Sequence, residues 1–401
     1  MTTHVFRGGV VVDADGAREA TVVVEDDRIV SVDPVDSDDG GADRARAADT
    51  DSVTHLDGAY LAPGLVDAHV HLMMDASPNP SANMDASTAS LAYQATRNLR
   101  AAVESGVTTV RDLGAPDDIA IDARTAVDRG VLAGPRVHAC GRNVVMTGGH
   151  GHWFGREADG PHEVRKAVRE QLKAGADVVK CMATGGVLTE GAQTGSPELT
   201  PDELTALVDA ASAKGVPTAA HAHGTQGIEN AVAAGITSVE HGTYMNERAA
   251  EAMADAGTYW VPTASAVHGI VDNADQGTIP DWAVEKGEHA RDAFGDAFEH
   301  ALAAGVTVAM GTDAGTPYNR FADIPHELEL LVEYGMTPAE ALEAATSNAA
   351  ELLGIGDETG RVAPGLAADL VVLPADPRED ESVWQQPERV MARGRFVNHM
   401  A

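Results

Sequence analysis

Two histidines, His69 and His71, stand at the end of an apolar run that spans residues 65–72. In a β-strand, side chains two positions apart point to the same face and lie about 6.6 Å apart along the strand. Both imidazoles can therefore reach one metal ion, and imidazole is a common ligand of zinc. The pair alone is a weak signal, because two polar residues at the end of any strand give the same pattern.

Side chains of ligand type also end other apolar runs. A lone histidine at the end of a strand is more often a hydrogen-bonded polar residue than a ligand, and a lone aspartate in a segment such as GTDAG is often part of a turn. Their recurrence at the ends of separate runs instead predicts one shared metal centre. The further candidates are Lys180 in VVKCM, His221 in AAHAHG, His241 in SVEHG and Asp313 in GTDAG.

Lys180 is one of only five lysines and lies inside an apolar run, where an unpaired ammonium group is costly. One interpretation is a lysine that pairs with a buried carboxylate. The other is a neutral amine that reacts with carbon dioxide to give a carbamate, whose two anionic oxygens can bridge two metal ions. Lysine suits this chemistry because burial lowers its pKa, whereas arginine stays charged.

The complete donor set favours two divalent ions. It contains four histidines, one aspartate and a bridging carbamate; imidazole suits zinc, and the mixed nitrogen and oxygen donors also admit manganese, cobalt or iron. Two ions about 3.5–4 Å apart can share a hydroxide whose pKa falls towards about 7. We expect Asp313 to bind one ion and also to act as the base, since a base must lie within about 2.6–3.2 Å of the proton it takes.

The candidates sit on an alternating pattern of apolar and alanine-rich segments between about residues 64 and 354. Several apolar runs follow a glycine that can end a helix in the left-handed conformation. A strand, a loop and a helix repeated eight times predict an α/β fold of the (β/α)8 TIM-barrel type, whose chemistry lies at the C-terminal ends of the strands. The predicted strands are residues 65–72, 107–114, 136–141, 177–183, 216–224, 236–242, 258–263 and 306–315.

Both ends of the chain are rich in short strands. Alternating β-branched and polar residues, punctuated by Asp-Gly and Asp-Pro, precede residue 35, and a similar texture returns after residue 359. We expect the two ends to pair in a small β-sandwich domain. The resulting division is 1–63 and 356–401 for the sandwich and 64–355 for the barrel, with an acidic exposed loop at 36–51.

The composition limits the class of protein. The chain has 401 residues, of which 44% are apolar, so it can bury a large core, and its formal net charge of −34 argues against nucleic-acid binding. Two cysteines, Cys140 and Cys181, exclude a disulfide scaffold. No signal peptide and no run of about 18 apolar residues is evident. We therefore expect a cytoplasmic protein without a membrane partner.

Taken together, the motifs resemble the amidohydrolase superfamily over nearly the whole chain. LAPGLVDAHVHL is similar to the family's entry motif, and VVKCMATGG, AAHAHG, SVEHG and GTDAG resemble the subgroup of Xaa-Pro dipeptidases (prolidase-like), metallocarboxypeptidases and related amidases. Imidazolonepropionase-like relatives use one metal and do not use the lysine of the fourth strand. The resemblance implies one ion on His69, His71 and Asp313, a second on His221 and His241, and carboxylated Lys180 as the bridge.

The resemblance also implies residues that contact the substrate. His150 and His152 lie in a glycine-rich loop, residues 146–155, from which relatives direct a histidine to the substrate, although a plain flexible loop has the same composition. Tyr244 matches a tyrosine that polarises the scissile carbonyl in relatives. His223 stands where some relatives have tyrosine, and strand alternation turns it to the same face as the preceding histidine.

We expect a metal-dependent hydrolase that cleaves the amide bond of a dipeptide or N-acyl amino acid, with Xaa-Pro dipeptides first. In this hypothesis the shared hydroxide attacks the carbonyl carbon, and Asp313 passes the proton to the leaving amine. A cyclic-amide hydrolase or aminohydrolase-type deaminase of the same fold is one alternative. An inactive scaffold is another alternative. It would be expected to lack some of the metal ligands, whereas all six ligand positions are filled in this sequence. A homo-oligomer is expected from the resemblance alone.

The preferred side chain of the substrate stays open at this point. A preference for a basic side chain needs an acidic residue that faces the pocket. Glu190, Asp323 and Glu327 all lie on segments that can do so, and the sequence does not choose among them.

The charge pattern yields a first prediction. With 62 acidic against 28 basic residues, the surface either simply keeps the protein soluble or is adapted to a cytosol of high salt. We favour the halophilic hypothesis, because at about 1 M salt the Debye length of about 3 Å screens repulsion between carboxylates. Lowering KCl to about 0.1 M, where the Debye length is about 10 Å, should then lower the midpoint of thermal unfolding followed by circular dichroism. A midpoint that does not fall contradicts the hypothesis.

Overall fold

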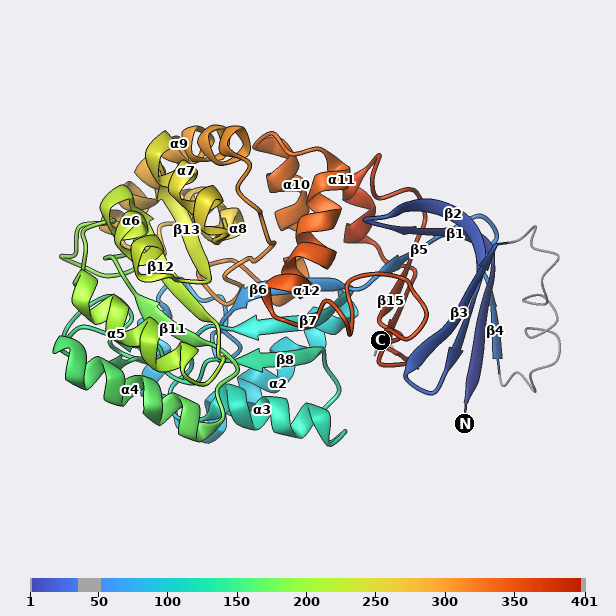
Figure 1. Cartoon of the computed structure of the whole chain (residues 1–401), viewed down its shortest axis with the longest axis horizontal. Helices are drawn as coiled ribbons and strands as arrows, with labels where there is room; N and C mark the ends of the chain where they lie inside the picture. Colours follow the sequence, from blue (N-terminus) through green and yellow to red (C-terminus); the bar gives the residue numbers. More distant parts are fainter. Residues whose placement is uncertain (1, 35–51, 398–401) are drawn as a thin grey trace.

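The computed structural model is a (β/α)8 barrel joined to a smaller β-sheet (Figure 1). In Figure 1 the barrel fills the larger end of the molecule, and the sheet built by the chain ends extends from one side of it. The predicted α/β fold is thereby confirmed. The structure describes residues 2–34 and 52–397, so the predicted acidic loop at 36–51 lies outside the described residues.

Seven parallel strands and one irregular segment form the barrel, and they coincide with the eight predicted runs. The strands are almost entirely buried because side chains fill the interior and helices cover the outside. They are β6 (Leu65–Val70), β7 (Val107–Asp112), β8 (Arg136–Ala139), β11 (Val179–Met182), β12 (Thr218–Gly224), β13 (Ser238–Tyr244) and β14 (Tyr259–Val261), with the short β9 (Val144–Val145) and β10 (Arg156–Glu157) beside β11.

The eighth predicted strand, residues 306–315, closes the ring through isolated bridges and not through a regular ladder. Val308 bridges to β14, and Ala314 bridges to β6. Between β8 and β11, the amide of Asp177 donates to the carbonyl of Ala139 at 2.8 Å. Backbone hydrogen bonds therefore connect each strand of the barrel to the next.

Helices cover the outer face of the barrel. The structure has eleven α-helices among the described residues. They are α2 (Thr88–Glu104), α3 (Ile119–Asp128), α4 (Gly160–Ala174), α5 (Pro201–Ser212), α6 (Thr225–Ala234), α7 (Glu247–Ala256), α8 (Ala264–Val271), α9 (Asp281–Ala304), α10 (His326–Glu333), α11 (Pro338–Glu343) and α12 (Ala349–Leu352), together with short helices at 80–85, 274–276, 321–323, 344–348 and 381–385. The helices α4, α6, α7 and α9 end on a glycine in the left-handed conformation, as the glycine pattern predicts.

The two chain ends build one sheet of eight strands. Phe396 at one edge contacts the rings of His4 and Phe6, with centroids 4.7 and 6.1 Å apart, so the sheet curls back on itself around its own apolar core. The domain boundaries at 63 and 355 stay a prediction. The strands are β1 (Thr3–Asp13), β2 (Gly16–Glu25), β3 (Arg28–Pro34), β4 (Ser52–His55), β5 (Tyr60–Pro63), β15 (Leu370–Leu373), β16 (Arg389–Ala392) and β17 (Arg395–Phe396), in the order β17-β16-β15-β5-β1-β2-β3 with β4 beside β1.

A buried aspartate, Asp369, fastens this sheet to the barrel. Its carboxylate accepts hydrogen bonds from Arg136 of β8 at 3.3 Å, from the hydroxyl of Thr359 at 3.2 Å and from the backbone amide of Arg393 at 2.7 Å. Only 1% of Asp369 is exposed. The two parts of the molecule thus share an ion pair that is largely shielded from water, because the Arg136 and Asp369 side chains are only 16% and 1% exposed.

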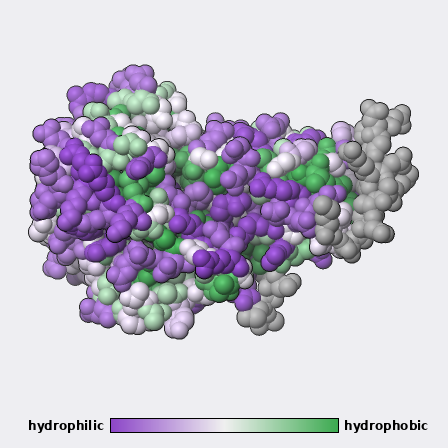
Figure 2. All heavy atoms as spheres, turned by 60° about the horizontal axis from the view of Figure 1, so that its bottom comes forward, coloured by the Kyte–Doolittle hydropathy of each residue, from purple (hydrophilic) through white to green (hydrophobic). Residues whose placement is uncertain are grey.

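Hydrophilic residues cover most of the face that Figure 2 shows. Within the described part of the chain, the exposed large hydrophobic side chains are Val30, Val53, Tyr93 and Val131. Among the helices that the structure describes, none combines the length and the apolar character needed to span a bilayer.

Replacement of Asp369 by alanine tests the connection between the two parts. Because the change leaves the mostly buried Arg136 guanidinium without its partner, we expect the free energy of unfolding in urea to fall by about 3 kcal/mol. Asp128→Ala is the matched control, because this exposed carboxylate pairs with Arg393 at 3.6 Å and its loss should cost less than about 1 kcal/mol. Equal effects of the two substitutions would contradict this account.

Candidate metal centre

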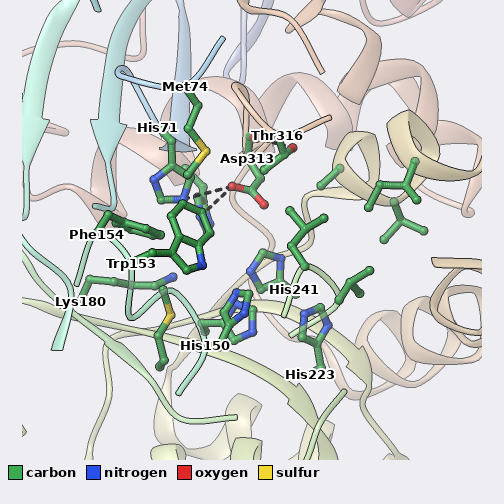
Figure 3. Close-up of a pocket in the computed structure, with 18 residues that line it drawn as sticks. His71, Met74, His150, Trp153, Phe154, Lys180, His223, His241, Asp313 and Thr316 are labelled. Atoms are coloured by element: carbon green, nitrogen blue, oxygen red, sulfur yellow. Dashed lines mark hydrogen bonds and ion pairs between the residues drawn. The ribbon is translucent and has the colours of Figure 1, made fainter. Parts of the chain in front are cut away.

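A cavity opens at the C-terminal ends of the barrel strands (Figure 3). Its walls combine histidines, one lysine and one aspartate with apolar side chains. The structure brings together all the residues that the sequence nominated as ligands: His69, His71, Lys180, His221, His241 and Asp313 all line this cavity.

The first group of donors is His69, His71 and Asp313. One carboxylate oxygen, Asp313 Oδ1, lies 3.4 Å from His69 Nε2 and 3.2 Å from His71 Nε2 (Figure 3). The Nδ1 atom of His71 must carry a proton, because its partner at 2.8 Å is the carbonyl of Gly114, which can only accept. Against the opposing effect of burial, the Asp313 carboxylate raises the pKa of His71, and Nε2, which faces that carboxylate, is the nitrogen that can serve as a metal ligand once it carries no proton.

The second group is His221, His223 and His241, whose ligand atoms lie within 4.8 Å of one another. Their ring centroids are 4.5–4.7 Å apart. Nδ1 of His241 is 2.7 Å from the hydroxyl of Thr263, and Nδ1 of His223 is 2.7 Å from the hydroxyl of Thr243. These contacts leave the opposite nitrogen of each ring for another partner.

Lys180 lies in β11 and is only 1% exposed. Its Nζ atom has no hydrogen-bond partner among the described residues. Burial lowers the pKa of this amine, although the nearby carboxylates of Glu240 and Asp313 act in the opposite direction. The neutral amine is the form that can react with carbon dioxide.

The unpartnered atoms of the site fit divalent cations. Among the described residues, Lys180 Nζ, His221 Nε2 and Asp313 Oδ1 are buried without a hydrogen-bond partner. A buried polar atom without a partner is expensive, so such atoms at one place indicate a ligand. Burial lowers the pKa of His69 to about 4, and the neighbouring histidines outweigh burial and lower the pKa of Asp313. The neutral imidazole and the carboxylate are the forms that bind metal.

Unusual backbone conformations aim two of these side chains. His241 has a φ of 69° and Asp313 a φ of 59°, in the left-handed region that non-glycine residues rarely adopt. At His241 the strand β13 carries one residue more than its neighbour β12, which is the signature of a β-bulge. The indole of Trp260 donates to the His241 carbonyl at 2.8 Å and secures the bend. Strain of this kind is concentrated at functional sites.

A buried ion pair beneath the site was not predicted from the sequence. Glu240 accepts hydrogen bonds from Arg111 at 3.0 Å, from Ser238 at 2.5 Å and from Nδ1 of His69 at 2.9 Å. Burial would raise the pKa of Glu240, but Arg111 and His69 outweigh it and hold the pKa at about 2. The carboxylate thus fixes the proton of His69 on Nδ1. The sequence signal that could have indicated this ion pair was the presence of Arg111 and Glu240, with opposite charges, inside two otherwise apolar strands.

A second buried carboxylate, Asp67, holds β6 against the segment that carries Asp313. It accepts from the backbone amides of His69 and Thr312 at 3.0 and 3.1 Å, and from the Thr312 hydroxyl at 2.6 Å. Burial raises the pKa of Asp67 to about 7. These bonds set the distance between the strand ends that contribute the first group of donors.

Two of the predicted substrate contacts, His150 and His223, also line the cavity. The ring of His150 stacks on that of His221 with centroids 4.3 Å apart, and its Nδ1 lies 2.7 Å from the hydroxyl of Thr189. The glycine-rich loop is therefore a built part of the wall. His152 is exposed in the same loop and contacts the carbonyl of Gly149 through Nδ1.

Tyr244 is placed differently from the expectation. It ends β13 and is about half-buried, but it is not among the residues that line the cavity. Burial raises its pKa. Its role in polarising the carbonyl stays a prediction.

None of the three acidic candidates for a basic specificity lines the cavity. Glu190 and Asp323 are exposed. Glu327 is buried and caps the start of α8, where it accepts from the backbone amides of Ala264 and Ser265 at 2.8 and 2.7 Å. The Glu327 carboxylate therefore stabilises the start of α8 and does not face the substrate cavity.

Comparison with known proteins gives one family and several similar structures. The sequence profile of the Amidohydrolase family matches residues 60–397. The ochratoxinase of Aspergillus niger is 31% identical over 422 aligned positions, covering 96% of this chain and 84% of that protein. A crystal structure of a Xaa-Pro dipeptidase with bound methionine in the active site is 31% identical with a TM-score of 0.90, covering 98% and 99% of the two chains. A prolidase complexed with N-methylphosphonate-L-proline is 30% identical with a TM-score of 0.90 and is covered completely, as is this chain.

The Glu240 network can be tested by Glu240→Gln. The amide cannot satisfy Arg111, Ser238 and His69 together and removes the charge that pairs with a buried guanidinium. We expect the free energy of unfolding to fall by about 3–5 kcal/mol and metal affinity, measured by dialysis and elemental analysis, to fall about 10- to 100-fold.

Glu104→Gln is the matched control, since this more exposed carboxylate pairs with Arg100 at 2.8 Å on one helix. It should cost less than about 1 kcal/mol and leave metal affinity unchanged. Wild-type stability of Glu240→Gln would contradict the proposed importance of the pair.

Proposed function

The chain belongs to the amidohydrolase family and is a hydrolase of carbon–nitrogen bonds, and from this premise we propose that it cleaves the amide bond of a dipeptide or N-acyl amino acid in the manner of an Xaa-Pro dipeptidase. One observation carries the proposal: six side chains of ligand type, from five separate strand ends, face one cavity. The likeness to a Xaa-Pro dipeptidase and to a prolidase over nearly the whole chain supports the choice of substrate.

We propose that this donor set holds two divalent ions, with zinc first and manganese, cobalt or iron as alternatives. When bound, such ions supply Lewis acidity that polarises an amide carbonyl and makes water more acidic. We propose that the first ion is held by His69, His71 and Asp313, the second by His221 and His241, and that Lys180 bridges them as a carbamate.

Asp313 is the residue we propose as the base. Its Oδ1 atom faces the two Nε2 atoms of His69 and His71, and the adjacent oxygen Oδ2 stays available for a proton. The neighbouring histidines keep this buried carboxyl ionised, because they lower its pKa. Asp313 can therefore take a proton from the attacking water at Oδ2 and return it to the nitrogen of the leaving amine.

His150 is the polar residue best placed to contact the substrate. The Thr189 hydroxyl engages its Nδ1, so Nε2 is the remaining polar atom of a ring that lines the cavity. We propose that this nitrogen bonds a polar group of the substrate. His223 lines the same cavity and either contacts the substrate or joins the second group of donors.

The inactive scaffold is disfavoured, because each of the six predicted ligand positions holds a side chain that can bind metal. A cyclic-amide hydrolase or deaminase uses the same type of centre, and the products distinguish it. Release of ammonia without release of an amino acid would indicate the deaminase, and opening of a cyclic amide to a single product would indicate the cyclic-amide hydrolase.

The proposal predicts activity in a defined screen. Metal-free protein, loaded separately with zinc, manganese or cobalt, should release free amino acid from Xaa-Pro dipeptides or N-acyl amino acids, and a chelator should remove this activity. Product analysis by liquid chromatography, with a parallel assay for ammonia, is the measurement. Absence of amino-acid release with all three metals rejects the proposed activity.

Lys180→Ala tests the bridging role. Because the carbamate would supply an oxygen to each ion, the substitution should reduce bound metal from two ions per chain. It should also lower kcat by a factor of about 1,000 or more. Lys214→Ala, which replaces an exposed lysine, is the control. In addition, ¹³C NMR of protein incubated with ¹³C-bicarbonate should show a carbamate signal that the variant lacks. A variant with wild-type metal content and activity refutes the assignment.

A further inference from the structure

Two apolar walls flank the donors of the cavity on opposite sides of the barrel. One wall belongs to the loop that follows the third strand, and the other to helix α8, which follows the seventh strand. Four strands separate these positions in a ring of eight, so the walls face each other across the barrel mouth. Figure 3 shows the labelled aromatic wall on the side of His71 and Lys180.

The first wall is aromatic. Phe154 meets the ring of His71 edge-on with centroids 5.5 Å apart, and Trp153 packs on Phe154 with centroids 4.6 Å apart. Phe154 is only 3% exposed, whereas Trp153 is partly exposed and both line the cavity. The two rings thus present an apolar aromatic surface next to the first group of donors.

The second wall is aliphatic and held rigidly. Ala266, Val267 and Ile270 lie on one face of α8, at the spacing of neighbours on a helix, and all three line the cavity. The carboxylate of Glu327 fixes the first turn of this helix through three hydrogen bonds of 2.6–2.8 Å to Ala264 and Ser265. Glu327 is thereby a positioning residue for the wall.

Neither wall offers a partner for a charged side chain. Among the described residues that line the cavity, the ones that carry a full charge at neutral pH by type are Lys180 and Asp313, and both belong to the donor set. A lysine, arginine, aspartate or glutamate side chain of a substrate would lose its hydration here without gaining an ion pair. An apolar group packed against either wall instead gains binding free energy, because its apolar surface is removed from water.

We propose that the enzyme selects amides that carry an apolar group on both sides of the scissile bond, one against Trp153 and Phe154 and the other against α8. This inference rests on the proposed amide hydrolysis and adds the specificity of the same site. It assigns Trp153 and Val267 as specificity-determining residues, each for one side of the bond.

The test uses the metal-loaded full chain and two series of N-acyl amino acids. One series varies the amino acid (Leu, Phe, Ser, Lys, Glu) and the other varies the acyl group (hexanoyl, benzoyl, acetyl, succinyl). Ionised groups common to all members cancel within a series. The large apolar members should exceed the small member of each series, Ser or acetyl, in kcat/KM by about 10- to 100-fold, with charged members lowest.

Substitutions separate the two walls. Trp153→Ala should lower the apolar preference about 10-fold in one series, and Val267→Ala should do so in the other. Val271→Ala is the matched control, because Val271 belongs to the same helix but does not line the cavity. Circular dichroism verifies folding, and the isosteric Val267→Thr gives the same readout if Val267→Ala does not fold.

The outcomes are distinguishable. No hydrolysis of any member by the wild type rejects the proposed function and this inference with it. Hydrolysis led by a Ser, Lys, Glu, acetyl or succinyl member rejects the inference alone. The inference is also rejected if the two substitutions change the same series, or if Val271→Ala has the effect of Val267→Ala.

Discussion

The structure of the site depends on buried polar atoms that have no hydrogen-bond partner within the described part of the protein. Lys180 Nζ, His221 Nε2 and Asp313 Oδ1 have no hydrogen-bond partner among the described residues. Each such atom costs about 1–3 kcal/mol when it stays without a partner. A ligand that supplies positive charge to the imidazole and carboxylate atoms removes most of this cost, so cation binding and the stability of the barrel mouth are coupled.

The rest of the barrel supplies rigidity where the donors need it. Left-handed backbone at His241 and Asp313 costs about 1–2 kcal/mol per residue, and it persists because surrounding bonds leave the chain no alternative. The amide of Asp313 donates to the carbonyl of His69 at 2.7 Å, which joins two donor-bearing strands directly. Strain at the ligands is therefore balanced by the closed ring of strands behind them.

The sheet formed by the chain ends contributes to the site at a distance. Strand β5 runs through Gly64 directly into β6, which carries the first two histidines. A side chain at Gly64 would meet Thr108 at 2.2–2.8 Å, so only glycine lets β6 start this close to β7. The Gly64 amide donates to the carbonyl of Asp369 at 2.9 Å. Sheet and barrel together thus fix the position of the strand that begins the metal centre.

The sequence alone determined the alternation of strands and helices, the glycine stops and the residues of ligand type, because these depend on local periodicity and on side-chain chemistry. It also placed each candidate at the end of its strand, and the cavity contains all six. The ion pair of Arg111 and Glu240 could not be predicted from local patterns, since the two residues are 129 positions apart in the chain.

Only the tertiary structure decided which acidic residues face the site. Glu327 looked free in the sequence but caps a helix, and Tyr244 fitted a motif but stands outside the lining. The apolar walls could not be predicted from the sequence either, because nothing in the local pattern distinguishes Trp153 and Val267 from other hydrophobic residues. Only the folded barrel places both of them in the cavity lining. Orientation toward a shared cavity is a property of packing between distant segments, and local sequence patterns do not encode it.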